Sequence, residues 1–331
     1  MVRRGYANVR ASGHCVAPDF PRANREGGAL RNLSVAAQRR LRRDLGMRLT
    51  PRLLAPLLLA CASSAFCAAS SWKPLFNEKD LTGWDTWLAK PEASIEVPGL
   101  VRGADGKYSE PIGPNRDPLG VFRVETLDGA PVIHISGQIF GTLTSKETFA
   151  NCHVRLQFKW GERRWAPRAD VVRDSGLLYR IHGPSGVSGG VWPPCIELQI
   201  QEHDVGDLWT VDSRAYVTAT PKVGDKFAVY DPTKPLIELW KWEGPNSSRC
   251  VKMADYEKPR GEWNTVELLC VGEESIHVVN GHVVLRVKQA RDFDGKAALT
   301  SGAIALQSEG AEVFYRNVEV LPLEELPAEY R

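Results

Sequence analysis

Acidic and amide side chains alternate with aliphatic ones over residues 196–201, which read Ile-Glu-Leu-Gln-Ile-Gln. In a β-strand successive side chains point to opposite faces, so the three aliphatic residues are expected to enter a core. Glu197, Gln199 and Gln201 would then line the other face together. Such a row supplies the paired donors and acceptors that sugar hydroxyls require, although a solvated sheet face has the same composition. We interpret the row as one wall of a carbohydrate-binding groove.

Four other residues near this row could contact a sugar. Arg180 and His182 end the preceding apolar segment, and we expect them on a strand beside the row. Trp192 and Trp209 flank the row in the sequence. Because the apolar faces of a sugar ring stack on aromatic side chains, both tryptophans are candidate substrate contacts, with burial in the core as the alternative for each.

Two carboxylates five residues apart, Glu197 and Glu202, could form an acid/base pair. Both would face the groove only if a β-bulge lies between them; without a bulge they point in opposite directions and cannot cooperate. With either glutamate, His203, Asp204 and Asp207 could also bind a hard divalent cation through oxygens and one imidazole. No strict ligand spacing is present, so a divalent metal is a candidate cofactor and no more.

The elements that must position these residues are short segments of strand-like composition, separated by Gly, Pro and Asn. No stretch shows an apolar period of 3.6 residues over the length of a helix. This pattern predicts an all-β protein, with a single antiparallel β-sandwich or jelly roll over residues 72–331. One hairpin is nearly explicit, because Asn280-Gly281 between two alternating segments fits a type I′ turn.

Residues 47–71 have the layout of a secretory signal: a short basic region, an apolar run and then small residues. The apolar run is too short to span a bilayer stably. Residues 1–46 are either a disordered leader or precede the true start at Met47. Cleavage after Ala69 would release a soluble protein, whereas the lipobox-like sequence ending at Cys61 would attach a lipid there. Both interpretations predict an exported protein, in the periplasm or at the cell surface.

Charge is unevenly distributed along the chain. The first 71 residues hold 12 of the 42 basic and 3 of the 40 acidic residues, so the remainder has a net charge near −7 although the whole chain is at +2. A mildly acidic body has no electrostatic reason to bind nucleic acid or an anionic membrane. We therefore expect membrane contact only through a lipid anchor at Cys61.

Four of the seven cysteines lie in the predicted domain: Cys152, Cys195, Cys250 and Cys270. Four cysteines allow three pairings in an oxidising compartment, and the sequence does not choose among them. None of the four has metal-ligand spacing. The alternation of Cys270 with Val266 and Leu268 favours a small core residue at that position.

Segments of this body resemble the 3-keto-disaccharide hydrolase family, formerly a domain of unknown function, whose fold is like that of concanavalin A-type lectins and glucanases. The segments that carry the resemblance are Pro74–Trp84, Phe140–Glu147, Arg155–Trp160, Asp174–Arg180, Glu197–Asp207, Glu262–Glu267, Gly302–Gly310 and Tyr315–Val318. They occur in the family's order over residues 72–323. The resemblance implies a concanavalin-like sandwich that acts on oxidised sugars.

The chemistry that this resemblance implies suits the carboxylates. A ketone at C3 of a sugar acidifies the C2 proton, so a base can remove it, form an enolate and expel the C1 substituent, after which water adds. The resemblance implies Glu197 as the base or a metal ligand, with Glu202 and His203 as acid or ligand candidates. It also implies four groove positions: Lys146, Arg180, Gln199 and Asp207.

Two other functions fit the same residues. The spacing Glu197-x-Gln199-x-x-Glu202 matches the catalytic strand of laminarinase-type retaining glycosidases, but the central acid of that strand is a neutral glutamine here. The second alternative is a non-catalytic carbohydrate-binding module, since many proteins of this fold are lectins.

Overall fold

The computed structural model describes residues 71–242 and 244–331. The leader at residues 1–46, the signal segment and the lipid site at Cys61 therefore lie outside the described residues, apart from the end of the segment 47–71. No helix in the described part is long and apolar enough to cross a membrane.

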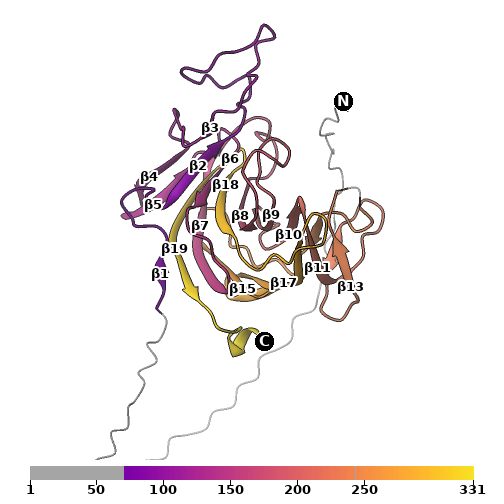
Figure 1. Cartoon of the computed structure of the whole chain (residues 1–331). Coiled ribbons are helices and arrows are strands. Elements are labelled where there is room, and N and C mark those ends of the chain that lie inside the picture. Colours follow the sequence, from indigo (N-terminus) through magenta and orange to yellow (C-terminus); the bar gives the residue numbers. More distant parts are fainter. Residues whose placement is uncertain (1–70, 243) are drawn as a thin grey trace, which may run out of the picture. The chain divides into compact units, whose positions relative to one another are not determined.

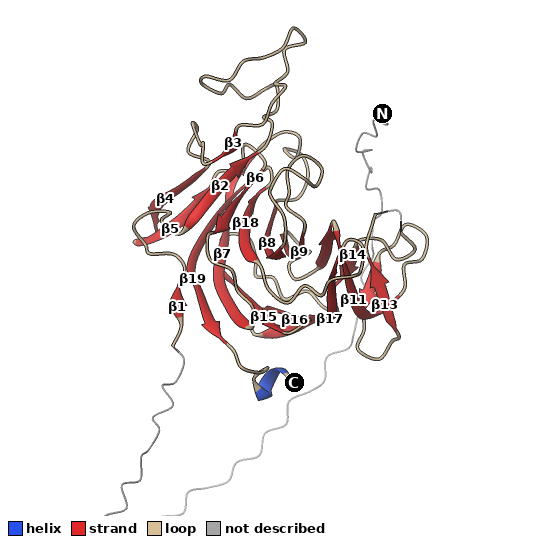
Figure 2. Cartoon of the chain, in the orientation of Figure 1, coloured by secondary structure: helices blue, strands red, loops and turns tan. Residues whose placement is uncertain are grey.

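Nearly all regular structure of the described residues is β-strand, as Figure 2 shows, and they contain one short 3₁₀ helix, η1 (Ala328–Tyr330). Sheet A contains β1 (Lys73–Pro74), β4 (Phe122–Leu127), β5 (Ala130–Ile135), β7 (Cys152–Arg164), β13 (Leu236–Leu239), β15 (Asn264–Val271), β16 (Glu274–Val279), β17 (His282–Asp292) and β19 (Ala311–Pro322). Sheet B contains β2 (Trp84–Leu88), β3 (Gly113–Pro114), β6 (Gly141–Ser145), β8 (Asp174–Ile181), β9 (Cys195–Gln201), β10 (Leu208–Val211), β12 (Ala228–Tyr230), β14 (Arg249–Val251) and β18 (Ala303–Ser308).

The two sheets form the layers of a sandwich. In Figure 1, β18, β8 and β9 lie in one layer and β7, β15 and β17 in the other. The strand β11 (Ser213–Thr220) joins them, because it pairs with β17 and β13 of sheet A and with β12 of sheet B. All pairings are antiparallel except that of β12 with β14, which is parallel. The predicted antiparallel β-sandwich is confirmed.

The core lies between the sheets and contains the aliphatic half of the alternating segment at 196–201. Ile196, Leu198 and Ile200 are fully buried and belong to the same cluster as Leu156 and Phe158 of β7. Glu197, Gln199 and Gln201 accordingly project from the other side of β9, as predicted. We name this side, turned away from sheet A, the outer face of sheet B.

The register of sheet B assembles the outer face from segments far apart in the sequence. Glu197 of β9 lies opposite Leu178 of β8 and Trp209 of β10. Two strands further along the sheet, Gln307 of β18 lies opposite Thr142 of β6. Because directly opposed residues project from the same face of an antiparallel pair, all of these side chains share the outer face.

The hairpin predicted at Asn280-Gly281 is confirmed between β16 and β17. Both turn residues have positive φ, 49° at Asn280 and 81° at Gly281, as a type I′ turn requires. The Asn280 side chain also accepts a hydrogen bond from the Thr265 amide at 2.9 Å and so ties the turn to β15.

Replacing Gly281 by alanine should lower the free energy of unfolding by about 1–2 kcal/mol, because alanine is strained at this φ. A Cβ at this position meets no atom within 4 Å, so backbone conformation alone is tested. Gly281→Asn should cost less, since asparagine tolerates the left-handed region. Urea unfolding of the three proteins measures the difference, and equal stabilities of the alanine variant and the wild type would contradict the turn assignment.

Candidate functional site

Glu197 is a buried carboxylate without a partner. Its side chain on β9 is 6% exposed, and no hydrogen bond or ion pair within the described residues engages its oxygens. Burial raises the pKa of this carboxyl well above its usual range, and the negative charge of Asp174 raises it further, while Arg249 and Arg168 oppose the shift. The result is a carboxylate that binds a proton strongly when it is ionised.

The carboxylate of Glu197 lies over a glycine of β8, Gly176. A Cβ at Gly176 would collide with Oε1 of Glu197 and with Oε1 of Gln307, so both oxygens occupy the space of a missing side chain. The Gln307 oxygen and the Oε1 of Gln199 are buried and have no hydrogen-bond partner in the described residues. Buried acceptors of this kind usually bond to water or a ligand in a native protein.

A cluster of acidic residues around one arginine adjoins this carboxylate. Asp174 of β8 forms an ion pair with Arg168 at 2.6 Å and accepts a hydrogen bond from Nε2 of Gln199 at 3.1 Å. Burial outweighs the charge of Arg168 and raises the pKa of Asp174 to about 7. Glu309 lies 3.9 Å from the same guanidinium, and burial raises its pKa as well. Negative charge is therefore costly throughout this side of the site.

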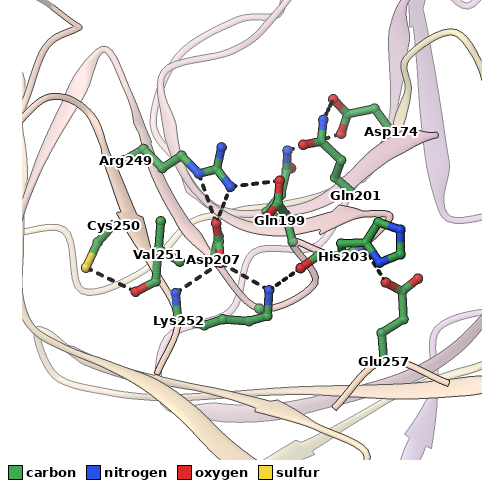
Figure 3. A network of polar contacts seen from close by, with 12 residues as sticks. Asp174, Gln199, Gln201, His203, Asp207, Arg249, Cys250, Val251, Lys252 and Glu257 are labelled. Carbon is green, nitrogen blue, oxygen red and sulfur yellow. Dashed lines mark hydrogen bonds and ion pairs between the residues drawn. The ribbon is translucent and has the colours of Figure 1, made fainter. Parts of the chain in front are cut away.

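Arg249 lies on the other side and is held in place by aspartates, as Figure 3 shows. Asp207 is fully buried and accepts hydrogen bonds from Nε and Nη2 of Arg249 at 2.9 and 2.5 Å, and from the amide of Lys252 at 3.0 Å. Asp204 lies 2.8 Å from the same Nη2. These bonds leave Nη1 of Arg249 without a bond to the residues drawn in Figure 3. Asp207, expected in the groove, thus acts by orienting a cation.

Aromatic rings cover this side of the outer face. Trp209 stacks on Trp242, with ring centroids 5.7 Å apart and planes 5° from parallel, and the guanidinium of Arg249 lies 5.5 Å from the Trp209 ring centre. Trp242 is 55% exposed and presents the surface that a sugar ring could cover. The Nε1 donors of Trp209 and Trp87 are buried and have no hydrogen-bond partner among the described residues, so they too are available to a ligand.

The loop 183–192 lies over the β2 and β6 part of the same face. Ser185 hydrogen-bonds Thr142 of β6 at 3.0 Å, and Gly186 approaches Trp87 so closely that a Cβ would collide with its ring. Trp192 is half-buried and stacks on Phe140, with 6.1 Å between ring centroids. Trp192 therefore belongs to the wall of this loop and does not pair with Trp209.

Glu202 and His203 lie away from Glu197, in a cavity of about 340 Å³ at the end of β9 that Trp160 and Glu257 also line. The pairing of β8 with β9 runs without a register shift, so no bulge turns Glu202 toward the outer face. Its carboxylate instead accepts hydrogen bonds from Nη1 and the backbone amide of Arg173, each at 2.9 Å. Of the two alternatives left open by the spacing, the structure has the one in which Glu197 and Glu202 do not cooperate.

Arg180 is not on the face that holds Glu197. Its φ is 52°, and the pairing of β8 with β18 is irregular at this point, which turns the side chain toward sheet A. The guanidinium donates hydrogen bonds to the carbonyls of Gly272, Glu273 and Glu274, at 2.6 to 2.9 Å. Those bonds occupy both of its terminal nitrogens, which are therefore not free for a ligand.

Two other predicted residues lie at the margins. His182 lines a second cavity, of about 470 Å³, together with Asp212, Asp292 and Phe293. Lys146 is exposed and lies 3.5 Å from Asp85. Gln201 remains with Glu197 on the outer face, where its amide donates to Asp174.

The candidate metal ligands do not converge. His203 is exposed at the end of β9, Asp204 pairs with Arg249, and Glu197 is on the outer face. Within the residues that the structure describes, no group of three or more His, Cys, Asp or Glu side chains is arranged to hold a metal ion. No chemical step is therefore assigned to a bound metal.

Sequence reasoning missed several residues of this site: Arg168, Asp174, Gln307, Glu309, Arg249 and Trp242. Asp174, Gln307 and Glu309 fall in segments that carry the family resemblance, so the resemblance could have indicated them. Trp242 lies between β13 and β14, and Arg249 begins β14; no local pattern there marks a contact with the outer face.

Asp174 should make stability depend on pH. Its pKa of about 7 exceeds the ordinary 3.8, so between about pH 4 and pH 7 the folded protein keeps a proton that the unfolded chain releases. The contribution of Asp174 to the free energy of unfolding therefore falls as pH rises through this window. Asp174→Asn cannot ionise, so its stability relative to the wild type should increase from pH 4 to pH 7.

Urea titrations at several pH values measure this difference. Asp85→Asn, which removes a half-exposed carboxylate from the same sheet, is the matched control. A wild-type minus Asp174→Asn difference that stays constant with pH would show that Asp174 is ionised throughout the window.

Comparison with known proteins identifies the family. The family model described as "3-keto-alpha-glucoside-1,2-lyase-like domain" matches residues 71–321. Comparison with curated proteins gave no match.

Several solved structures are similar in fold. One from Parabacteroides distasonis ATCC 8503, provisionally described as a glycosyl hydrolase, is 20% identical, with 76% of this chain and 94% of that chain covered and a TM-score of 0.43. A second from the same organism is 19% identical, with 76% and 100% covered and a TM-score of 0.40. A Bacillus licheniformis β-glucanase is 10% identical, with 78% and 100% covered and a TM-score of 0.34.

The family model spans the whole sandwich, including every strand that contributes to the outer face of sheet B. The chain belongs to the family of 3-keto-alpha-glucoside-1,2-lyase-like domains and is a carbohydrate-active protein.

Proposed function

We propose that this protein cleaves 3-keto-glycosides by removing the C2 proton, eliminating the C1 substituent and adding water across the resulting double bond. The observation that carries the proposal is the Glu197 carboxylate, which is buried, has no partner and has a raised pKa on a face rich in unpartnered polar atoms. The name of the family, which specifies a 1,2-lyase acting on 3-keto-α-glucosides, supports the same reaction.

Proton abstraction from C2 is assigned to Glu197. The C3 ketone stabilises the carbanion as an enolate, so a carboxylate can act as the base if its proton affinity is raised toward that of the substrate. Burial provides that increase at Glu197. The missing side chain at Gly176 leaves the space that its Oε1 occupies. The electron pair of the C2–H bond passes into the enolate and then expels the C1 oxygen, which takes up the proton that Glu197 removed from C2.

Negative charge that develops on the enolate oxygen requires a nearby cation. Arg249 is suited to this role, because Asp207 and Asp204 hold its Nε and Nη2 and so orient the guanidinium before the substrate arrives. Its charge already acts on the carboxyl of Glu197. A preoriented cation needs no rearrangement during the reaction, which is the condition under which electrostatic stabilisation is most effective.

Recognition of the sugar is assigned to the unpartnered atoms of the outer face. The amide oxygens of Gln199 and Gln307 can accept hydrogen bonds from hydroxyl groups, and the indole nitrogens of Trp87 and Trp209 can donate to them. Trp242 offers an exposed ring for the apolar face of a sugar or of the leaving group.

The geometry disfavours a retaining glycosidase of the laminarinase type. That mechanism needs two carboxyl groups about 5–5.5 Å apart on either side of one glycosidic bond. Glu202, the second carboxylate of the strand motif, is bound to Arg173 at a different cavity.

Glu197→Gln should lower kcat on a 3-keto-α-glucoside about 10²–10⁴-fold, because the amide cannot accept the C2 proton. The assay supplies 3-keto-trehalose or an aryl 3-keto-glucoside and measures the released leaving group. Glu274→Gln, the same substitution at a half-exposed residue that begins β16 of sheet A, is the matched control and should retain activity. Binding of the substrate analogue to the Glu197→Gln protein, measured by calorimetry, should persist.

Each other outcome identifies a different function. Sugar binding without turnover of any 3-keto-glycoside by the wild type would establish a non-catalytic binding module. Turnover of an unoxidised β-glucan that is lost in Glu197→Gln would establish a glycosidase.

Activity should fall at acidic pH with a midpoint above the ordinary glutamate value, because the base is active only when ionised and its pKa is raised. The charge of Asp174, which is present above its own pKa of about 7, contributes to that increase, so Asp174→Asn should move the part of the acidic limb of kcat/KM that lies near and above pH 7 to lower pH. A pH profile of kcat/KM for the two proteins tests this. If the acidic limb does not move in the variant, the charge of Asp174 does not influence the pKa of the catalytic base.

A further inference from the structure

We infer that Cys152 and Cys270 form a disulfide bond that joins β7 to β15. The two residues are direct partners in the antiparallel pairing of these strands. Opposed residues in such a pair project from the same face with Cα atoms about 4.5–5.5 Å apart, which lies within the range that a disulfide spans. Both side chains are 4% exposed and belong to the core cluster. The structure thus places two thiols side by side in the core.

The other two cysteines have no such partner. Cys195 projects from the outer face of sheet B, in a small cluster with Leu178, whereas Cys250 lies in the main core. Cys195 is opposite Val211 and Cys250 is opposite Leu208, so the two thiols lie on different faces of the sheet. Each of the three pairings that four cysteines allow would form two disulfide bonds. The structure instead favours one bond, between Cys152 and Cys270, with Cys195 and Cys250 as free thiols.

A buried guanidinium adjoins the cysteine pair. Arg180 extends from β8 to the turn after β15, where it binds the carbonyls of Gly272, Glu273 and Glu274. Its Nε is buried and makes no hydrogen bond to nitrogen or oxygen within the described residues. The hydrogen bond from Cys152 and, with it, the charge of Arg180 lower the pKa of the Cys270 thiol, against the effect of burial.

The bond forms by thiol–disulfide exchange. The neighbouring Cys270 and burial raise the pKa of the Cys152 thiol. With a glutathione disulfide as oxidant, the thiolate of one cysteine attacks a sulfur and expels one glutathione thiolate, forming a mixed disulfide. The other cysteine loses its proton and attacks the protein sulfur of that mixed disulfide, expelling the second glutathione thiolate. The two cysteines together lose two electrons and the glutathione disulfide gains them.

The bond would stabilise the sandwich by reducing the conformational freedom of the unfolded chain. It closes the long segment between residues 152 and 270, which contains the whole of β8, β9 and β10. A long closed loop restricts the unfolded ensemble strongly, and the native register needs no change to accept the link. Because both sulfurs are buried, the bond forms during folding or a local opening. This inference does not depend on the proposed function.

The test is refolding of the full chain in a buffer of reduced and oxidised glutathione. Remaining thiols are alkylated and the protein is then digested without reductant. We expect a linked pair of peptides that contain Cys152 and Cys270 and that separate on reduction. The reduced protein should have a lower melting temperature, by on the order of 10 °C. Recovery of both cysteines as alkylated peptides, or of either one in a different linkage, would overturn the inference.

Two variants support the assignment. Cys270→Ser should abolish the effect of reductant on the melting temperature, whereas Cys195→Ser, on the other sheet, should retain it. If Cys270→Ser does not fold, the peptide map of the wild type still decides. An unchanged effect of reductant in a folded Cys270→Ser protein would show that another bond is responsible.

Discussion

The burial of an unpartnered carboxylate at Glu197 is the constraint on which the rest of this site depends. An ionised carboxylate away from water costs several kcal/mol unless it is paired, so the group either binds a proton or acquires a partner from a ligand. The sheet tolerates it because Gly176 leaves the space that its oxygen fills and because the charges of Arg249 and Arg168 act on it. The same cost raises the pKa of Glu197, which is the property that the proposed proton abstraction next to a ketone requires.

Two arginines show how the fold assigns similar side chains to different tasks. Arg249 is fixed by the buried carboxylate of Asp207. Its Nη1 makes no hydrogen bond to the residues shown in Figure 3 and lies beside the candidate site. Arg180 uses both terminal nitrogens to bind the carbonyls of the turn after β15 and lies next to Cys270. The difference arises from the acceptors around each guanidinium. The carboxylate of Asp207 orients Arg249 and leaves part of its guanidinium available to a ligand, whereas the three carbonyls around Arg180 use its terminal nitrogens.

The local pattern was sufficient for the fold and for part of the site. Period-two alternation at 196–201 predicted which side of β9 is polar, because side-chain direction in a strand depends only on position along it. The Asn280-Gly281 turn was predictable for a similar reason, since it requires only residues that accept positive φ. The resemblance to the family added the residues that lie within its segments.

The tertiary structure decided everything that depends on pairing between strands. It showed that no bulge lies between Glu197 and Glu202 and that an irregular pairing turns Arg180 to the other side of its sheet. It also brought Gln307 and Arg249 to the outer face from segments remote in the sequence. By itself the sequence determined the all-β class and the polar face of β9, because both follow from properties of single residues and near neighbours. The residues that join Glu197 on that face from other strands could not be predicted, because the register of sheet B is set by the packing of the whole core.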